Sequence, residues 1–256
     1  MMPMNMKTFV IDQKLNYQEC CRQGEYVNKY YEIEQSNSSL KFNTIPDACV
    51  DLQFAFLEGK AVICACGSFL SSACSPSSEY QWCFGVKFNP GKYPQLVSEH
   101  MDHLIEGHVI MEEYDWLKKI GERITKAGSF EDRIRIFEEC FPFESQFSWM
   151  SSMVVKAMEM IEQSHGCINI SGIAEELQYN QRYMDRVFRR ETGLSMKKFA
   201  TIIQIQTAIR YLQEERIDEV YEKLGYYDQS YFIKKFRKYT SMTPREYCKK
   251  IGPIIV

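Results

Sequence analysis

The sequence predicts an α+β chain, in which a β-rich N-terminal part with added helices precedes an all-α C-terminal domain. In the first ninety residues apolar side chains alternate with polar ones, whereas later they recur at helical spacing. An internal repeat in the last hundred residues divides the helical part into two helix-turn-helix units. We expect a β-rich domain at 1–113, a helical linker or dimerisation region at 114–147, and the all-α domain at 148–256.

The strands are predicted from strict alternation. Apolar residues occupy every second position from Tyr80 to Phe88 and again from Val50 to Phe56. A turn at 58–60 leads back into a strand over Ala61–Cys66, and Tyr26–Glu34 is a further strand. The pair Asn89 and Pro90, followed by Gly91, ends the sheet region.

The helices that follow are predicted from the spacing of their apolar residues. Helical spacing runs over 97–105 and 116–124, and a third helix begins at Ser129, where Asp132 completes a cap. Residues 140–146 are the expected linker, and from Trp149 onward the chain is mainly helical. The apolar residues of this region either form a dimer seam or cover the β-domain; they are Trp116, Ile120, Ile124, Ile134 and Phe137.

Composition indicates a globular protein. The 256 residues are 45% hydrophobic and 25% charged, and the most apolar stretch, Ala61–Leu70, is too short to cross a bilayer. The N-terminal residues lack the apolar core of a signal peptide, so we expect a cytoplasmic protein that does not bind membranes. Ten cysteines without a CxxC pair are expected to be reduced thiols, and no structural metal is expected.

Charge is distributed unevenly along the chain. The net charge is −3, but residues 1–147 carry 14 basic and 21 acidic side chains, whereas residues 148–256 carry 17 and 13. Only the C-terminal part therefore has the positive field that attracts a phosphate backbone.

The internal repeat is the most specific feature of the sequence. Ile173–Leu177 resembles Val220–Leu224 at an offset of 47 residues, and Asn180–Arg190 resembles Asp228–Lys238 at an offset of 48. One residue is therefore inserted in the turn of the second copy. Two copies of helix, short turn and helix indicate a duplicated structural unit.

In the first copy, the second helix is amphipathic. Asn180 is its predicted N-cap, and the predicted buried face consists of Tyr183, Met184, Val187 and Phe188. The residues predicted to contact DNA are Gln181, Arg182, Asp185, Arg186 and Arg189. Arginine pairs bidentately with guanine in the major groove, and glutamine pairs with adenine.

The second copy repeats this design. Gly225 is suited to the left-handed residue that ends a helix, and Asp228 caps the next one. Phe232, Phe236 and Tyr239 are expected to pack inward. The residues predicted to read bases are Gln229, Ser230, Tyr231 and Lys234, and those predicted to contact phosphates are Lys235, Arg237 and Lys238. Either helix alone is typical of an ordinary solvated basic face, but the repeated cap, apolar face and basic face together favour DNA binding.

The segment from Val154 to Lys250 resembles the DNA-binding domain of the AraC/XylS family of bacterial transcription regulators. Matching pieces are Ile173–Leu177, Tyr183–Gly193, Ala208, Gly225–Phe232, Phe236–Lys238 and Thr243–Tyr247. The resemblance implies seven helices, of which a long one at Met196–Glu214 joins the two units. It also implies that the recognition helices enter successive major-groove segments of double-stranded operator DNA, with base-reading positions at Arg182, Asp185, Arg186, Gln229, Ser230, Tyr231 and Lys234.

Three residues depart from the family pattern. Tyr221 stands where the family has a small residue, as Ala174 does in the first copy. Ser241 replaces a usual glycine, and Gln204 replaces a common basic residue in the joining helix.

Residues 17–115 are similar to a sensor-type domain, on the pieces Pro46–Phe54 and Phe84–Gly91. The similarity implies a cupin-like barrel or sandwich that binds a small-molecule effector, forms a homodimer, or does both. RNA polymerase is a further expected partner if the protein is an activator. The residues proposed to bind an effector are Asp51, Gln53, Trp82 and Phe84, although the first two are equally expected to face solvent on a strand, and the aromatic pair to be core.

Other readings of the N-terminal part remain open. A metal bound by His100, His103 and His108 is less expected than ordinary histidines. A thiol switch built from Cys64, Cys66, Cys74 and Cys83 would make the protein a redox-controlled regulator. A DNA-repair-type enzyme fused to the DNA-binding domain is a third reading. Because no nucleophile–base pair or phosphate loop stands out, we expect no enzyme activity and no cofactor.

Overall fold

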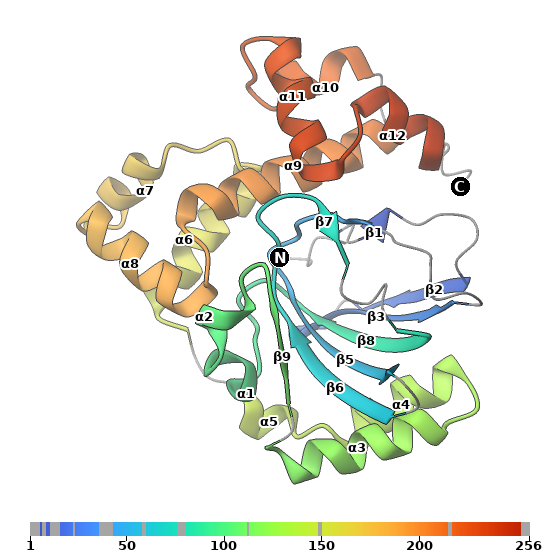
Figure 1. Ribbon diagram of the computed structural model, residues 1–256. Coiled ribbons are helices and arrows are strands. Elements are labelled where there is room, and N and C mark those ends of the chain that lie inside the picture. Colours follow the sequence, from blue (N-terminus) through green and yellow to red (C-terminus); the bar gives the residue numbers. More distant parts are fainter. Residues whose placement is uncertain are drawn as a thin grey trace.

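The structure is a computed structural model that describes residues 6, 9–10, 16–22, 24–35, 43–57, 60–75, 80–111, 113–147, 150–214 and 217–251. Strands form the N-terminal part and helices the C-terminal part, and the helical part lies above the sheet in Figure 1. The α+β class and its order along the chain are therefore confirmed. The predicted turn residues Glu58 and Gly59, as well as Trp149, lie outside the described residues.

A six-stranded antiparallel sheet is the centre of the N-terminal part. Its order is β2 (Asn16–Cys21), β3 (Val27–Glu34), β8 (Trp82–Phe88), β5 (Val50–Leu57), β6 (Lys60–Cys66) and β9 (His108–Ile110). Four of these strands were predicted, whereas β2 and β9 were not. Leu52 and Phe54 face one side of the sheet and Ala55 the other, as the alternation requires. Gly85 permits the Tyr31 ring to cross β8, because a Cβ at this position would lie 2.0 Å from that ring.

Helices α3 (Asp115–Lys126) and α4 (Phe130–Cys140) cover one face of this sheet (Figure 1). Ile120, Ile124 and Phe137 belong to the same core cluster as Phe54 of the sheet. The Ser129 hydroxyl accepts a hydrogen bond from the Asp132 amide at 3.1 Å, which is the predicted cap.

Of the two alternatives for the apolar residues of 114–147, the structure shows that they cover the β-domain. Ile120, Ile124, Ile134 and Phe137 are buried against the sheet, and Trp116 is half-buried there. The expected linker at 140–146 contains a short helix, α5 (Phe143–Gln146), and joins the same core: the Phe143 ring stacks at 6.1 Å from that of Tyr26.

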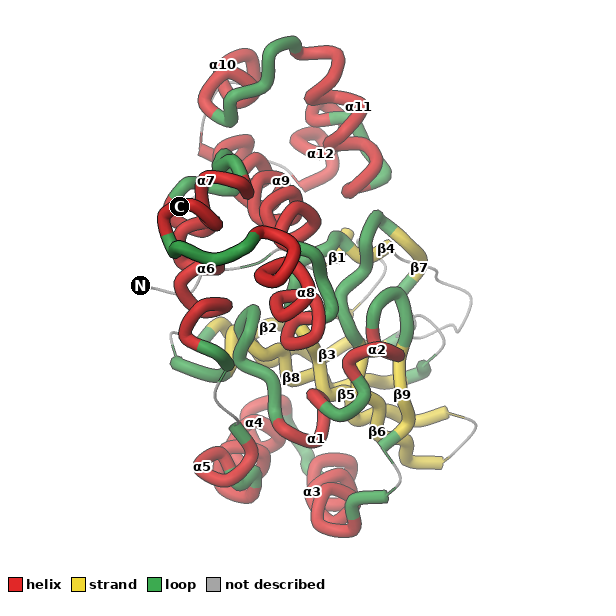
Figure 2. Tube along the Cα trace, turned by 90° about the vertical axis from the view of Figure 1, so that its left-hand side faces the viewer, coloured by secondary structure: helices red, strands yellow, loops and turns green. Residues whose placement is uncertain are grey.

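Smaller elements complete the N-terminal part. The predicted helix at 97–105 is present as two short helices, α1 (Gln95–Ser98) and α2 (Met101–Leu104). A three-stranded sheet of β1 (Phe9–Val10), β4 (Asn43–Thr44) and β7 (Ala73–Cys74) lies between the large sheet and the helical part (Figures 1 and 2). Within the described residues, no helix is both long and apolar enough to cross a membrane.

The C-terminal part contains the seven helices that the family resemblance implied. They are α6 (Ser152–Gln163), α7 (Ile170–Glu176), α8 (Gln181–Thr192), α9 (Met196–Glu214), α10 (Ile217–Lys223), α11 (Gln229–Thr240) and α12 (Pro244–Ile251). Helix α9 joins the two units and has the bounds predicted for it. It is buried over most of its surface, with Ile202, Ile203 and Ile205 all inaccessible to solvent.

The two parts are packed together. Ile45, Ala48 and Cys49 of the N-terminal part belong to the core cluster of the helical part. The side-chain amide of Gln206 on α9 donates to the Pro46 carbonyl at 2.9 Å, and both groups are buried. The loop before β5 is therefore inserted into the helical domain.

Candidate nucleic-acid interface

Helices α7 and α8 form the first helix-turn-helix unit. The turn passes through Gln178 at φ 58°, and the Tyr179 amide donates to the Ala174 carbonyl at 3.0 Å. The side chain of Asn180 accepts from the amides of Arg182 at 3.0 Å and Tyr183 at 3.2 Å, so it is the N-cap that the sequence predicts. Gly193 at φ 73° ends the helix. These local contacts fix the direction of the recognition helix α8.

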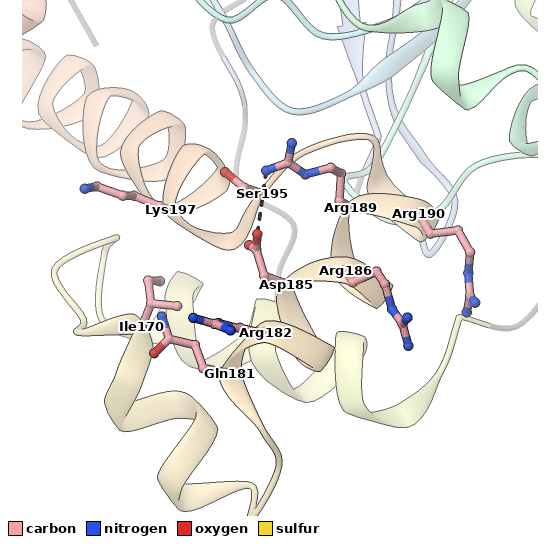
Figure 3. A pocket seen from close by; sticks show the side chains of 9 residues that line it. All are labelled: Ile170, Gln181, Arg182, Asp185, Arg186, Arg189, Arg190, Ser195 and Lys197. Atoms are coloured by element: carbon pink, nitrogen blue, oxygen red, sulfur yellow. Dashed lines mark ion pairs between the residues drawn. The ribbon is translucent and has the colours of Figure 1, made fainter.

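The exposed face of α8 borders an open hollow of about 750 Å³ (Figure 3). Five cationic side chains line it: Arg182, Arg186, Arg189, Arg190 and Lys197. Sequence reasoning missed Arg190 and Lys197, although the pair of adjacent arginines and the basic start of α9 were signals for them. Four guanidinium groups and one ammonium around a concave surface suit phosphate and guanine edges.

Asp185, one of the residues predicted to read bases, makes contacts within the domain. Its carboxylate accepts a hydrogen bond from the Met196 amide at 3.1 Å and lies 3.6 Å from the guanidinium of Arg189 (Figure 3). The first contact satisfies an amide at the start of α9, and the charge suits a helix N-terminus. Asp185 therefore fixes the junction between α8 and α9.

Tyr183 also differs from the prediction, because it is 46% exposed instead of buried. Met184, Val187 and Phe188 alone supply the buried face of α8 in this group. Tyr183 lies at the edge of that stripe, where its ring packs against Tyr179 and Arg186.

The second unit, α10 and α11, repeats the first in detail. The Tyr226 amide donates to the Tyr221 carbonyl at 3.0 Å, and Gly225 has φ 69°. Asp228 caps α11 by accepting from the Tyr231 amide at 2.7 Å. Because the turn bonds and the positive φ are equivalent up to Tyr226, the inserted residue of the second copy is Tyr227.

The ends of the two recognition helices are also equivalent. Thr192 donates to the Phe188 carbonyl at 2.7 Å, and Thr240 donates to the Phe236 carbonyl at 2.9 Å. Each threonine also accepts an amide two residues later. The two copies of the sequence repeat therefore make equivalent hydrogen bonds in their turns and at the ends of their recognition helices.

The predicted contact residues of α11 are exposed, with one exception. Gln229, Ser230, Tyr231, Lys234, Arg237 and Lys238 are exposed. Lys235 is half-buried instead: its ammonium donates to the Gln204 side chain at 2.8 Å and lies 5.2 Å from the centre of the Tyr226 ring. Burial lowers the pKa of Lys235. This lysine is engaged within the domain and does not extend toward a phosphate.

The three departures from the family pattern have visible consequences. Gln204 is buried and links α9 to the second unit, and Ser241 adopts φ 62° at the end of α11. Tyr221 is half-buried at the edge of the helical core, and its hydroxyl donates to the Glu222 carboxylate at 3.1 Å, so the larger residue is accommodated at the surface.

The four residues proposed to bind an effector do not share one cavity. Asp51 and Gln53 are buried on one face of the sheet, where the Tyr31 hydroxyl donates to Asp51 at 2.8 Å and accepts from Gln53 at 2.9 Å. The cavity beside them holds about 20 Å³, room for a single water-sized group. Phe84 lies in the core on the other face, and Trp82 packs there against Arg133.

The remaining N-terminal candidates are spread out. Among the described residues, no group of three metal-ligating side chains comes together. Cys64, Cys66 and Cys83 are buried, and burial raises the pKa of both Cys64 and Cys66. These two thiols lack the exposed, low-pKa character that a redox switch needs.

Two family models match the chain. Residues 173–250 match a model described as a helix-turn-helix domain, and residues 24–110 match a domain of unknown function, DUF6597. The first match covers both units built above.

Similar proteins include transcriptional regulators. The transcriptional regulatory protein YesN of Bacillus subtilis is 28% identical over 136 residues, which are 50% of this chain and 37% of YesN. The transcriptional activator RhaR of Yersinia pseudotuberculosis is 29% identical over 35% of this chain and 32% of RhaR. The chain thus spans about a third of the length of each of these two relatives. The structure of ToxT from Vibrio cholerae aligns over 94% of this chain and 98% of ToxT, at 15% identity and a TM-score of 0.42. Residues 173–250 therefore form a duplicated helix-turn-helix domain similar to the one found in regulators of the AraC/XylS family.

Proposed function

We propose that this protein is a sequence-specific regulator of transcription that binds double-stranded operator DNA through both helix-turn-helix units. The observation that carries the proposal is the equivalence of α8 and α11: each begins at a side-chain cap and presents an exposed polar and cationic face. A single amphipathic helix with a cationic face occurs in many kinds of protein. Two such helices joined by α9 suit successive segments of the DNA major groove.

The chemistry of the two faces suits different parts of one operator. Arg182 and Arg186 supply planar donors that pair with guanine, whereas Gln229 and Ser230 suit adenine and mixed edges. Arg189, Arg237 and Lys238 supply phosphate contacts that set register and affinity. With α9 between them, the two helices enter major-groove segments about 34 Å apart on one side of the duplex.

The test is selection of bound sequences from a random DNA pool. We expect a two-part motif, of which Arg182→Ala with Arg186→Ala erases one part, and Gln229→Ala with Lys234→Ala erases the other. Arg135→Ala, an exposed arginine on α4, is the matched control and should leave the motif unchanged. Selection of no motif by the wild-type chain at low salt would contradict the proposal. A one-part motif would restrict it to one unit.

A second proposal concerns control by a small-molecule effector, and a different cavity supports it. A cavity of about 340 Å³ lies between β6, β9 and α3, where the apolar side chains of Phe54, Ile63 and Met111 share the lining with Lys118 and Glu122. That size and mixed lining suit a small ligand with both apolar and polar groups. A Gly121→Val variant, which adds bulk beside Ile63, should abolish the thermal stabilisation that such a compound gives to wild type. Equal stabilisation of both chains would place the effector elsewhere.

A homodimer, contact with RNA polymerase and a cytoplasmic location belong to the same proposal. A dimer would have to use a surface other than the buried stripe of α3 and α4. Sedimentation of the full chain with and without operator DNA tests the dimer directly.

A further inference from the structure

Exposed tyrosines gather at the two helix-turn-helix units. In the described part of the chain, six large hydrophobic side chains are exposed, and four of these are tyrosines of the turns and recognition helices: Tyr179, Tyr183, Tyr227 and Tyr231. Their exposed fractions range from 46% to 102%. An exposed aromatic ring does not stabilise the protein through burial in its core. A group of such rings indicates a surface that contacts another molecule.

The four tyrosines form two pairs with the same spacing in the sequence. Tyr179 and Tyr183 are four residues apart, as are Tyr227 and Tyr231, and each pair maps onto the other at an offset of 48. In the second turn Tyr226 is buried, and the inserted residue Tyr227 is the exposed tyrosine that precedes the cap. The repeat thus keeps an exposed tyrosine before each cap and another in the first turn of each recognition helix.

The residues beside these tyrosines differ between the copies. Arg182 corresponds to Ser230 and Arg186 to Lys234, as expected if the two helices meet different bases. The tyrosines are the same in both copies, whereas the base-reading residues beside them differ. This pattern is expected if the tyrosines contact a part of DNA that does not depend on the base sequence. That part is the sugar–phosphate backbone, which tyrosine hydroxyls contact frequently.

Local packing holds three of these tyrosines, whereas Tyr227 is fully exposed. The rings of Tyr179 and Tyr183 stack with their centres 6.3 Å apart, and the Arg186 guanidinium lies 5.5 Å from the Tyr183 ring centre. In the second unit the Tyr231 ring lies 6.0 Å from that of Tyr226. By their position in the chain, the four tyrosines lie at the N-terminal ends of α8 and α11.

We infer that each tyrosine pair is a backbone clamp whose hydroxyls donate hydrogen bonds to phosphate oxygens on both halves of the operator. The inference rests on the proposed function. It adds hydrogen bonds from neutral tyrosine hydroxyls to the phosphate contacts that the arginine and lysine side chains make. Because tyrosine releases no counterion, the clamp contributes affinity without contributing to the salt dependence of binding. It also contributes equally to every DNA sequence.

The experiment compares Tyr→Phe variants of the full chain on two duplexes of about 30 base pairs, one carrying the selected motif and one of random sequence. We expect each double variant, Tyr179→Phe with Tyr183→Phe or Tyr227→Phe with Tyr231→Phe, to bind both duplexes about tenfold more weakly. The slope of log affinity against log salt should stay that of wild type. Arg189→Ala, which removes a proposed phosphate contact, should lower this slope by about one, and Arg186→Ala should weaken binding to the selected motif.

Tyr114→Phe, a half-exposed tyrosine on the N-terminal part, is the matched control and should bind as wild type does. Double variants that bind as wild type, while Arg186→Ala is weaker, would overturn the clamp and leave the proposed function intact. A changed preferred sequence would also overturn it, since that would mean base reading. If wild type binds neither duplex, the proposed function itself fails.

Discussion

The ammonium of Lys235 lies 2.8 Å from the side-chain oxygen of Gln204, and this contact ties the second recognition helix to the helix that joins the two units. The same oxygen accepts from the Tyr226 hydroxyl at 2.8 Å, and the Gln204 amide donates to the Leu224 carbonyl at 2.8 Å. Gln204 thus bonds to the turn and to α11 at once. The positive charge that the family places on the joining helix is supplied here from α11.

From this contact we expect Lys235 and its neighbour Lys234 to behave differently. Lys235→Met should lower the free energy of unfolding by about 1 kcal/mol, because a hydrogen bond within the domain is lost, and should leave the salt dependence of DNA binding unchanged. Lys234→Met, at an exposed position, should leave stability unchanged and weaken binding to the selected motif by about 1–3 kcal/mol. Urea unfolding and salt titrations of both variants check this, and a lowered salt slope for Lys235→Met would contradict it.

Both units were predicted well from the sequence where local rules decide the structure. Asn180 and Asp228 were identified as caps because a short polar side chain before an amphipathic helix has one favourable use there. The positive φ of Gly225 followed from the same local reasoning.

Prediction from the sequence was wrong or incomplete where contacts between separate helices or strands decide the position of a side chain. Helical spacing could not show that Asp185 bonds to the start of α9 or that Lys235 reaches Gln204, because both partners come from another helix. Alternation placed Asp51 and Gln53 on the polar side of a strand, but it could not reveal that Tyr31 and Lys87 would enclose them. Tyr183 was misplaced because it lies at the edge of the apolar stripe, where a helical wheel does not discriminate.

Ser241 is expected to cost stability through its backbone. It adopts φ 62°, a region that favours glycine, at the position where the first unit has Gly193. Ser241→Gly should raise the free energy of unfolding by about 1 kcal/mol, although it removes a weak exposed hydrogen bond with Asn43 at 3.3 Å. The converse change, Gly193→Ala, should destabilise the protein, because a Cβ there would lie 2.7 Å from Ile105. Thermal or urea unfolding distinguishes the two; a less stable Ser241→Gly chain would contradict the argument.

Lys87 is expected to be the most sensitive polar residue of the sheet. Its buried ammonium lies 2.8 Å from Asp47 and also pairs with Asp51. Burial alone would lower the pKa of Lys87, but the two carboxylates hold it above its ordinary value, so the lysine stays charged. Lys87→Met would leave two buried carboxylates without their cation and should cost about 3–5 kcal/mol. Lys92→Met, which breaks an exposed pair with Glu25, is the control and should cost less than about 1 kcal/mol.

Glu162 on α6 should make stability depend on pH. Burial, with the nearby charge of Glu159, raises the pKa of Glu162 from its ordinary value of 4.5 to about 7. Below pH 4.5 the carboxyl is protonated in both the folded and the unfolded chain, and the folded state carries no penalty. As the pH rises toward 7, the unfolded chain loses this proton before the folded chain does, so stability falls by roughly 3 kcal/mol at most.

The isosteric change Glu162→Gln removes this titration. We expect the variant and wild type to have similar free energies of unfolding at pH 4, and the variant to be more stable by roughly 2–3 kcal/mol at pH 8. Because all other groups titrate alike in both chains, the difference between them isolates Glu162. Glu159→Gln, an exposed position, should give a smaller gain, since it removes only the repulsion. Urea unfolding of the three chains across this pH range is the measurement, and a difference between wild type and Glu162→Gln that does not vary with pH would refute the raised pKa.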